Sequence, residues 1–153
     1  MKWSPQRNES LPAALGRWVD DEVQRSLAAL SAREQVGEAV HEARRALKRA
    51  RALVKLAFRD PACQSRLEAD HTLRDAGRCV AVLRDTDVLV GTATGVQARA
   101  SDTRAPLVPQ SLMVALRADR DRLFGAAHAD DGPLIRGREH LIDLAFNAPL
   151  DDD

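Results

Sequence analysis

Apolar residues recur at helical spacing along most of the chain. The first such segment begins after Ser10, a residue type suited to capping a helix, and runs to about Leu30. Its apolar positions lie three or four residues apart, as on one face of a helix: Leu15, Trp18, Val19, Val23 and Leu27. The pattern predicts a first helix over residues 10–30, preceded by a loose polar segment over residues 1–9.

A second, longer helix is expected to follow directly. Ser31 and Glu34 have the spacing of a capping box, which would start this helix. Its end is expected near Phe58, because Pro61 cannot continue a helix and restricts the residue before it. The remaining pattern predicts a third helix over about 62–83, a short fourth helix capped by Asp85, a connection over 91–109, a fifth helix over about 110–128, a turn at 130–133 and a last helix over about 134–146.

These elements predict an all-α fold, a bundle of about five to six helices whose second helix is long. One domain is expected over residues 10–147, followed by an acidic tail over 148–153. Composition agrees with this prediction. Aromatic residues make up only 3% of the chain and Tyr is absent, whereas strand-rich folds usually recruit aromatic and β-branched residues.

The same composition indicates a cytoplasmic protein. Two cysteines, Cys63 and Cys79, are too few for a disulfide framework and are expected to be reduced. No apolar run is long enough to cross a membrane, and the first residues lack the apolar core of a signal peptide. We therefore expect no membrane association.

Charge is concentrated in one segment although the formal net charge of the chain is +0. Residues 41–59 contain seven basic side chains and one acid, Glu42, so this segment carries +6 and the rest of the chain −6. At about 100° per residue, six members of the segment fall within an arc of about 80° on a helical wheel: His41, Arg44, Lys48, Arg51, Lys55 and Arg59. Arg45 and Arg49 lie beside this arc, and the opposite side is apolar: Val40, Ala43, Leu47, Ala50, Val54 and Ala57.

A cationic helix face of this kind suits a linear polyanion, because Arg grips phosphate oxygens with two donors and Lys adds a mobile point charge. This cationic face, which we call the basic stripe, contains no aromatic residue on which bases could stack. The absence of aromatic residues disfavours binding of single-stranded nucleic acid. Three other interpretations stay open: a solvated face, pairing with acids of other helices, and contact with a nucleic-acid duplex. Arg74 and Arg78 add charge on the third helix, although Glu68, Asp70 and Asp75 offer them salt bridges, and Arg84 with Asp85 could form a local ion pair.

No pattern indicates an enzyme. The four histidines lack metal-ligand spacing, and neither a glycine-rich phosphate loop nor a nucleophile elbow is present, so we expect no catalytic residue, metal or cofactor. His41 titrates near neutrality and could serve as a general acid or base, but such a histidine is more often a hydrogen-bond donor to a phosphate or a packed helix residue. If it becomes charged on contact, binding would strengthen at low pH.

Two segments resemble the motifs of the CHAD domain, the conserved-histidine α-helical domain. The run Val40–Leu56 resembles its signature, in which a histidine, here His41, is followed by basic residues at 44, 48, 49, 51 and 55. The segment Leu73–Val90, which contains Arg84-Asp85-Thr86-Asp87-Val88, is similar to its second motif.

The resemblance implies a non-catalytic helical domain that binds inorganic polyphosphate through basic residues facing a cavity, in the cytoplasm and at polyphosphate granules. The implied ligand-facing residues are His41, Arg44, Lys48, Arg49, Arg51, Lys55 and Arg84, and we add Arg45, Arg74 and Arg78 as neighbouring cations. CHAD domains usually contain two related bundles and this chain carries one signature, so a homodimer is expected to rebuild the two-bundle cavity. The alternative function is a helical scaffold that regulates a partner protein, and nonspecific nucleic-acid binding is a further one.

Overall fold

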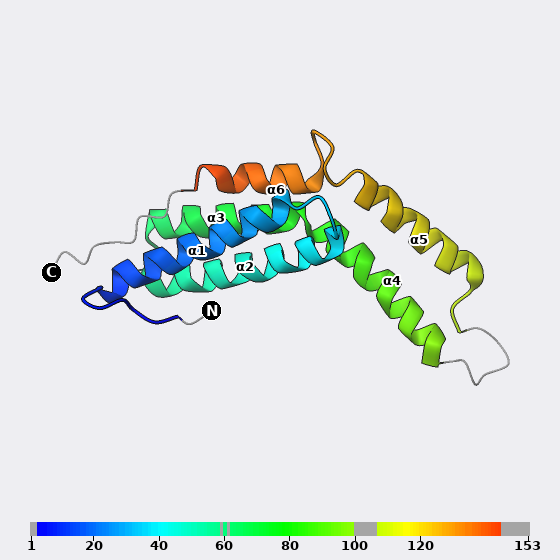
Figure 1. Ribbon diagram of the computed structural model, residues 1–153, viewed down its shortest axis with the longest axis horizontal. Helices are drawn as coiled ribbons and strands as arrows, with labels where there is room; N and C mark the ends of the chain where they lie inside the picture. Colours follow the sequence, from blue (N-terminus) through cyan, green and yellow to red (C-terminus); the bar gives the residue numbers. More distant parts are fainter. Residues whose placement is uncertain (1–2, 59, 61, 100–106, 145–153) are drawn as a thin grey trace.

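A computed structural model describes residues 3–58, 60, 62–99 and 107–144 of the chain. In this described part every regular element is an α-helix, which confirms the predicted all-α bundle. The helices, shown in Figure 1, are α1 (Leu11–Ser31), α2 (Val36–Ala57), α3 (Gln64–Cys79), α4 (Ala81–Arg99), α5 (Gln110–Gly125) and α6 (Pro133–Ile142).

Four of these helices form a bundle, and the other two form a hairpin that projects from one end of it (Figure 1). In the bundle α2 packs between α1 and α3, and α6 returns to cover both α3 and α1. The hairpin consists of α4 and α5, which pack mainly against each other. The hydrophobic core therefore lies among α1, α2, α3 and α6, and the outer surface of the hairpin is left to solvent.

The first two helices follow the predicted apolar pattern. The side chain of Ser10 accepts a hydrogen bond from the backbone N–H of Ala13 at 3.3 Å, which confirms the predicted N-cap of α1. The apolar stripe of α1 is buried at Leu15, Trp18, Val19, Val23 and Leu30. On α2 the predicted apolar side is buried at Val40, Ala43, Leu47, Ala50 and Val54. Their packing fixes the rotation of α2, and hence the directions in which its basic residues point.

The N-terminal segment that was expected to be loose makes specific contacts where the structure describes it. Trp3 stacks on Trp18 of α1, with the ring centroids 6.3 Å apart. Arg17 donates two hydrogen bonds to the carboxylate of Glu9, and this guanidinium lowers the pKa of Glu9 to about 2. These contacts hold the segment along the N-terminal half of α1.

The predicted capping box at Ser31 is wrong. Ser31 is the last residue of α1, and its hydroxyl donates a hydrogen bond to the Leu27 carbonyl at 2.8 Å instead of capping the next helix. Helix α2 begins at Val36, after Gln35 has taken a left-handed conformation with φ 52° and ψ 50°. The end of α1 agrees with the prediction within one residue, so the error lies in the start of α2, which follows the left-handed Gln35.

The prediction for residues 62–109 is wrong in two respects. The break between the third and fourth helices lies at Val80, not at Arg84–Asp87, and Asp85 is an exposed residue inside α4 rather than its cap. The predicted connection over 91–109 is helical as far as Arg99, and residues 100–106 lie outside the described part of the chain. Burial of Leu83 and Thr86 against the bundle carries α4 through the expected break, and packing against α5 supports it across its glycines.

The last two helices agree with the prediction within a few residues. Helix α5 ends at Gly125, and a turn through residues 126–132 leads into α6, which ends at Ile142, four residues before the predicted end at Phe146. Leu134 and Leu141 of α6 are fully buried. Gly137 lets α6 approach α3 closely, because a Cβ at this position would lie 3.3 Å from the Ala76 carbonyl oxygen. This contact fixes the orientation of α3, which carries part of the site described next.

Candidate functional site

The basic residues of α2 are divided between two surfaces of the bundle. Arg44, Lys48 and Arg51 point toward α3, whereas Arg45 and Arg49 point toward α1. The division follows from helical geometry. Consecutive residues of α2 point about 100° apart around the helix axis, and the apolar side of α2 is buried between α1 and α3. Arg44, Lys48 and Arg51 of the predicted arc thus share one surface, and Arg45 and Arg49, which the sequence placed beside the arc, lie on another surface with different surroundings.

The surface toward α3 is an open groove of about 200 Å³. Its lining comes from the two facing helices and the first residue of α4: Arg44, Leu47, Lys48, Arg51, Leu73, Arg74, Gly77, Arg78 and Ala81. Five of these residues are cationic and none is acidic. Arg74 and Arg78, which the sequence placed on a separate helix, thus share one groove with the cations of α2. We call this feature the α2–α3 groove.

Two cations of the α2–α3 groove have no carboxylate partner among the described residues. Neither Arg44, which is half-buried, nor Lys48, which is exposed, forms an ion pair or a side-chain hydrogen bond there. Both lie on α2, one turn apart. Like charges one turn apart on a helix repel each other by roughly 0.2–0.5 kcal/mol. These two side chains therefore supply uncompensated positive charge to the groove.

Arg51 is held by a carboxylate of the facing helix. Its Nε and Nη2 atoms donate hydrogen bonds of 2.8 and 3.1 Å to the two carboxylate oxygens of Asp70. This guanidinium lowers the pKa of Asp70, against the opposing effect of burial, and the positive charges of Lys55 and Arg74 lower it further. The pKa of Arg51 is raised by the same pair. Arg51 is thus fixed at the edge of the groove by a fork that has the geometry of phosphate recognition.

The two arginines of α3 are only weakly engaged. Nη1 of Arg78 donates a 3.2 Å hydrogen bond to Asp75 one turn earlier, and both side chains are largely exposed. Nη2 of Arg74 lies 3.2 Å from Nδ1 of His71, while Nε of Arg74 is buried without a hydrogen-bond partner among the described residues. The salt bridge considered for Arg78 is therefore present at an exposed position, where such pairs contribute at most about 1 kcal/mol. Arg74 keeps an unused donor beside the groove.

The basic residues that face α1 are engaged in a structural network. Nε of Arg49 lies 3.0 Å from an oxygen of Glu22, which is completely buried, and its Nη2 donates a 3.3 Å hydrogen bond to Glu42. Arg25 of α1 donates a 3.0 Å hydrogen bond to the other oxygen of Glu22. Arg45 approaches Glu42 at 3.8 Å. The acids of this network offset the charge of Arg45 and Arg49, so these two residues contribute mainly to the contact between α1 and α2.

The other predicted ligand residues do not line the α2–α3 groove. His41 is exposed near the start of α2, and Lys55 is exposed one turn beyond Arg51. Arg84 lies on α4, where it pairs with Asp87 at 3.9 Å rather than with the adjacent Asp85. Arg59, which belongs to the predicted basic arc but not to the predicted ligand residues, lies outside the described residues. The groove therefore unites Arg44, Lys48, Arg51, Arg74 and Arg78, which is half of the predicted set.

The floor of the groove consists of residues that the sequence did not assign to a binding site. Leu47 and Leu73 are buried there, and Gly77 leaves open space because a Cβ at its position would touch only Leu47, at 3.8 Å. The position of Gly77 could have been predicted from the sequence, because the spacing of Arg74, Gly77 and Arg78 places all three on one face of α3. An apolar floor lowers the local dielectric and strengthens the attraction between the surrounding cations and an anion.

Other kinds of site have little support in the described residues. No group of three or more His, Cys, Asp or Glu side chains gathers there to hold a metal ion. Cys63 and Cys79 are free thiols, and burial raises the pKa of Cys79, which makes its reactive thiolate form scarcer. None of the helices described combines the length and apolar character required to span a membrane. The α2–α3 groove differs from these features because five cations line it and no acid is in its lining.

Comparison of the chain with models of protein families, with curated proteins and with solved structures found no match.

Proposed function

We propose that this protein binds inorganic polyphosphate, or a similar phosphate polyanion, in the α2–α3 groove without catalysing a reaction. The observation that carries the proposal is the lining of the groove, where five cations from two facing helices meet and no acid is present. Even with Asp70 and Asp75 counted as partners of Arg51 and Arg78, five positive and two negative charges leave a net charge of +3.

A comparison within the chain supports a ligand at this position. Between α1 and α2, the arginines are interleaved with Glu22 and Glu42, as expected for a contact whose purpose is to hold two helices together. Between α2 and α3, Arg44 and Lys48 lack such acids among the described residues. The contact between α2 and α3 therefore lacks the compensation that the contact between α1 and α2 has, and an external anion would supply it.

The chemistry of the lining favours a polyanion that offers only phosphate groups. Single-stranded nucleic acids gain much of their binding energy from bases stacked on aromatic side chains, and the groove lining contains none. Arg44, Arg51, Arg74 and Arg78 supply planar donor forks, and Lys48 supplies a point charge, which together suit the oxygens of consecutive phosphates. The resemblance of residues 40–56 and 73–90 to CHAD motifs adds independent support, and with it we propose association with polyphosphate granules.

The test is a binding titration of labelled long-chain polyphosphate at near-physiological salt, with excess duplex DNA as competitor. The decisive variant is Arg44→Ala with Lys48→Ala, because neither side chain pairs with a described residue. We therefore expect this variant to keep its fold, which circular dichroism verifies. The matched control is Arg45→Ala with Arg138→Ala, which removes the same charge from exposed positions outside the groove.

We expect the groove variant to lose roughly tenfold or more in affinity, because it removes two charge-assisted contacts. The control is expected to stay within about threefold, since it changes only the long-range field. Equal losses in both variants would show nonspecific charge attraction. Equal competition by DNA would favour duplex nucleic acid, and absence of binding to the wild-type protein would favour the scaffold alternative.

A further inference from the structure

Arg74 of the α2–α3 groove has a histidine as its partner, whereas Arg51 and Arg78 have carboxylates. Nη2 of Arg74 lies 3.2 Å from Nδ1 of His71, one turn earlier on α3. A guanidinium only donates hydrogen bonds, so this contact is a hydrogen bond only while Nδ1 is an unprotonated acceptor. The imidazole is therefore neutral in this arrangement and carries its proton on Nε2. The hydrogen bond holds one end of the Arg74 fork against α3.

Protonation of His71 would break this contact. A protonated imidazole donates from both nitrogens, so Nδ1 could no longer accept a hydrogen bond from Arg74, and two positive charges would lie 3.2 Å apart. The repulsion would release the guanidinium, whose Nε already lacks a hydrogen-bond partner among the described residues. Because Arg74 lines the groove, its released fork would become available to a ligand there.

His71 is placed where its charge follows the pH of the solution. The side chain is exposed, and it points about 160° around the helix axis from Leu73, which is fully buried. Water therefore reaches the ring. Histidine is the side chain that ordinarily changes its charge between about pH 5 and pH 8, a range in which exposed carboxylates stay ionised.

The acids one turn before and one turn after this histidine on α3 are already engaged. Gln64 donates a 2.6 Å hydrogen bond to Glu68, and Arg78 donates a 3.2 Å hydrogen bond to Asp75. A new contact between the charged ring and either acid would draw the ring away from Arg74. Such a contact would act in the same direction as the repulsion, because it also removes the acceptor of Arg74.

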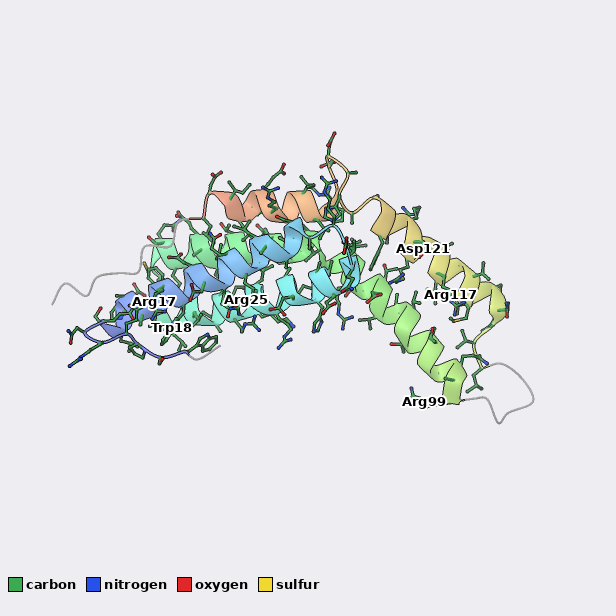
Figure 2. All side chains as sticks on the ribbon, viewed as in Figure 1. Arg17, Trp18, Arg25, Arg99, Arg117 and Asp121 are labelled. Carbon is green, nitrogen blue, oxygen red and sulfur yellow. The ribbon has the colours of Figure 1, made fainter. Side chains whose placement is uncertain are left out.

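The charges of the other helices do not replace this acceptor. The charged residues of α2 that lie across the groove or act on Asp70 are all cationic: Lys48, Arg51 and Lys55. From α6, Arg136 and Glu139 act on Cys79, about two turns beyond His71 on α3. Arg84 of α4 pairs with Asp87. Figure 2 shows three further charged residues of the hairpin beyond the end of the bundle: Arg99, Arg117 and Asp121.

We propose that His71 is a positioning residue that makes the α2–α3 groove sensitive to pH. The neutral ring holds Arg74 on α3, and the charged ring releases Arg74 to the ligand and adds a positive charge beside the groove. This role rests on the proposed binding of a polyanion in the groove. It predicts that the protein binds polyphosphate more tightly as the pH falls from about 8 to about 5.5.

The contact between the two side chains can be tested without a ligand. Nitrogen NMR of the imidazole ring at about pH 8 distinguishes the two neutral tautomers and reports a hydrogen bond at Nδ1. We expect His71 to carry its proton on Nε2, and the Nδ1 signal to move in Arg74→Ala because the donor is lost. An Nδ1 signal that is the same in both proteins would overturn the proposal.

The effect on binding is tested by titration of labelled polyphosphate at the two pH values. In His71→Gln the side-chain oxygen can still accept a hydrogen bond from Arg74 but cannot gain a charge, whereas His71→Lys is charged at both pH values. Two controls, His41→Gln and His140→Gln, remove exposed histidines that do not contact Arg74. Titration of the ligand itself is common to all variants.

We expect the wild-type protein to bind roughly threefold to tenfold more tightly at the lower pH, as one added charge and one released fork allow at an exposed site. Both controls should keep most of this change. His71→Gln should lose most of it and bind weakly at both pH values, and His71→Lys should bind tightly at both.

A pH effect that persists in His71→Gln and disappears in His41→Gln would overturn the role of His71. Equal binding by the wild-type protein at both pH values would also overturn this role, while polyanion binding itself would stand. A wild-type protein that binds no polyphosphate at either pH would instead refute the proposed function, and the role of His71 with it.

Discussion

Arg51 of α2 and Asp70 of α3 meet through two parallel hydrogen bonds, from Nε to Oδ1 at 2.8 Å and from Nη2 to Oδ2 at 3.1 Å. The carboxylate accepts two parallel hydrogen bonds from the guanidinium, as a phosphate group would. The pair links the two helices of the groove, and it also places an internal anion beside the cations that are proposed to bind a polyanion. Asp70 should therefore affect stability and ligand affinity in opposite directions.

Replacement of Asp70 by Asn is expected to strengthen polyphosphate binding by roughly threefold to tenfold. The substitution removes one negative charge at the groove and frees the Arg51 fork, each worth up to about 1 kcal/mol at a partly exposed position. The same titration that compares the groove variants measures this change. Weaker binding by the folded variant would mean that Asp70 positions Arg51 for the ligand rather than competing with it.

The ion pair also predicts how stability depends on pH. Because the pKa of Asp70 is lower in the folded protein than its usual value, the pair stabilises the fold at any pH above the unfolded pKa of about 3.9. This contribution is lost as the pH falls through the lower, folded pKa. Urea unfolding of wild-type protein and of Asp70→Asn should therefore give a constant difference between pH 8 and pH 5 and a shrinking one below about pH 4. A difference unchanged at pH 3 would contradict the assignment.

Glu22 is expected to matter for stability but not for polyanion binding. Its carboxylate is fully buried between Arg25 and Arg49, so Glu22→Ala would leave the partly buried Arg49 without its main partner. We expect a loss of roughly 2–4 kcal/mol in the free energy of unfolding, measured by urea denaturation. Arg45→Ala, which removes only a 3.8 Å contact at an exposed site, should change it by less than about 0.5 kcal/mol. Equal effects would show that the network does not hold the helices together.

Two glycines should respond oppositely to replacement by alanine. Gly77→Ala adds a methyl group that touches only Leu47 at 3.8 Å, so the better helix propensity of alanine should raise stability by roughly 0.5–1 kcal/mol. A Cβ on Gly132 would lie 2.5 Å from two backbone carbonyl oxygens in the turn before α6, so Gly132→Ala should lower stability by roughly 1–3 kcal/mol. Thermal unfolding measures both changes. A stabilised Gly132→Ala variant would show that the turn rearranges freely.

The sequence by itself determined the helical class, the ends of α1 at Ser10 and of α2 at Phe58, and the buried side of α2. These features depend on local chemistry, namely a side-chain cap, a proline after the helix and the spacing of apolar residues. The same local rules failed where tertiary contacts opposed them. The spacing of Ser31 and Glu34 does not start α2, which begins at Val36 after the left-handed Gln35. Packing against α5 keeps α4 helical across Gly91 and Gly95.

For the α2–α3 groove, the sequence determined that α2 is strongly basic. The charge of each residue and its direction around the helix axis can both be read from one segment. Only the tertiary structure decided which cations act together. Burial of the apolar side of α2 between α1 and α3 sends Arg49 to the buried Glu22 and sends Arg44 to the same groove as Arg74. This outcome depends on residues far apart in the chain, and no helical wheel of a single segment contains that information.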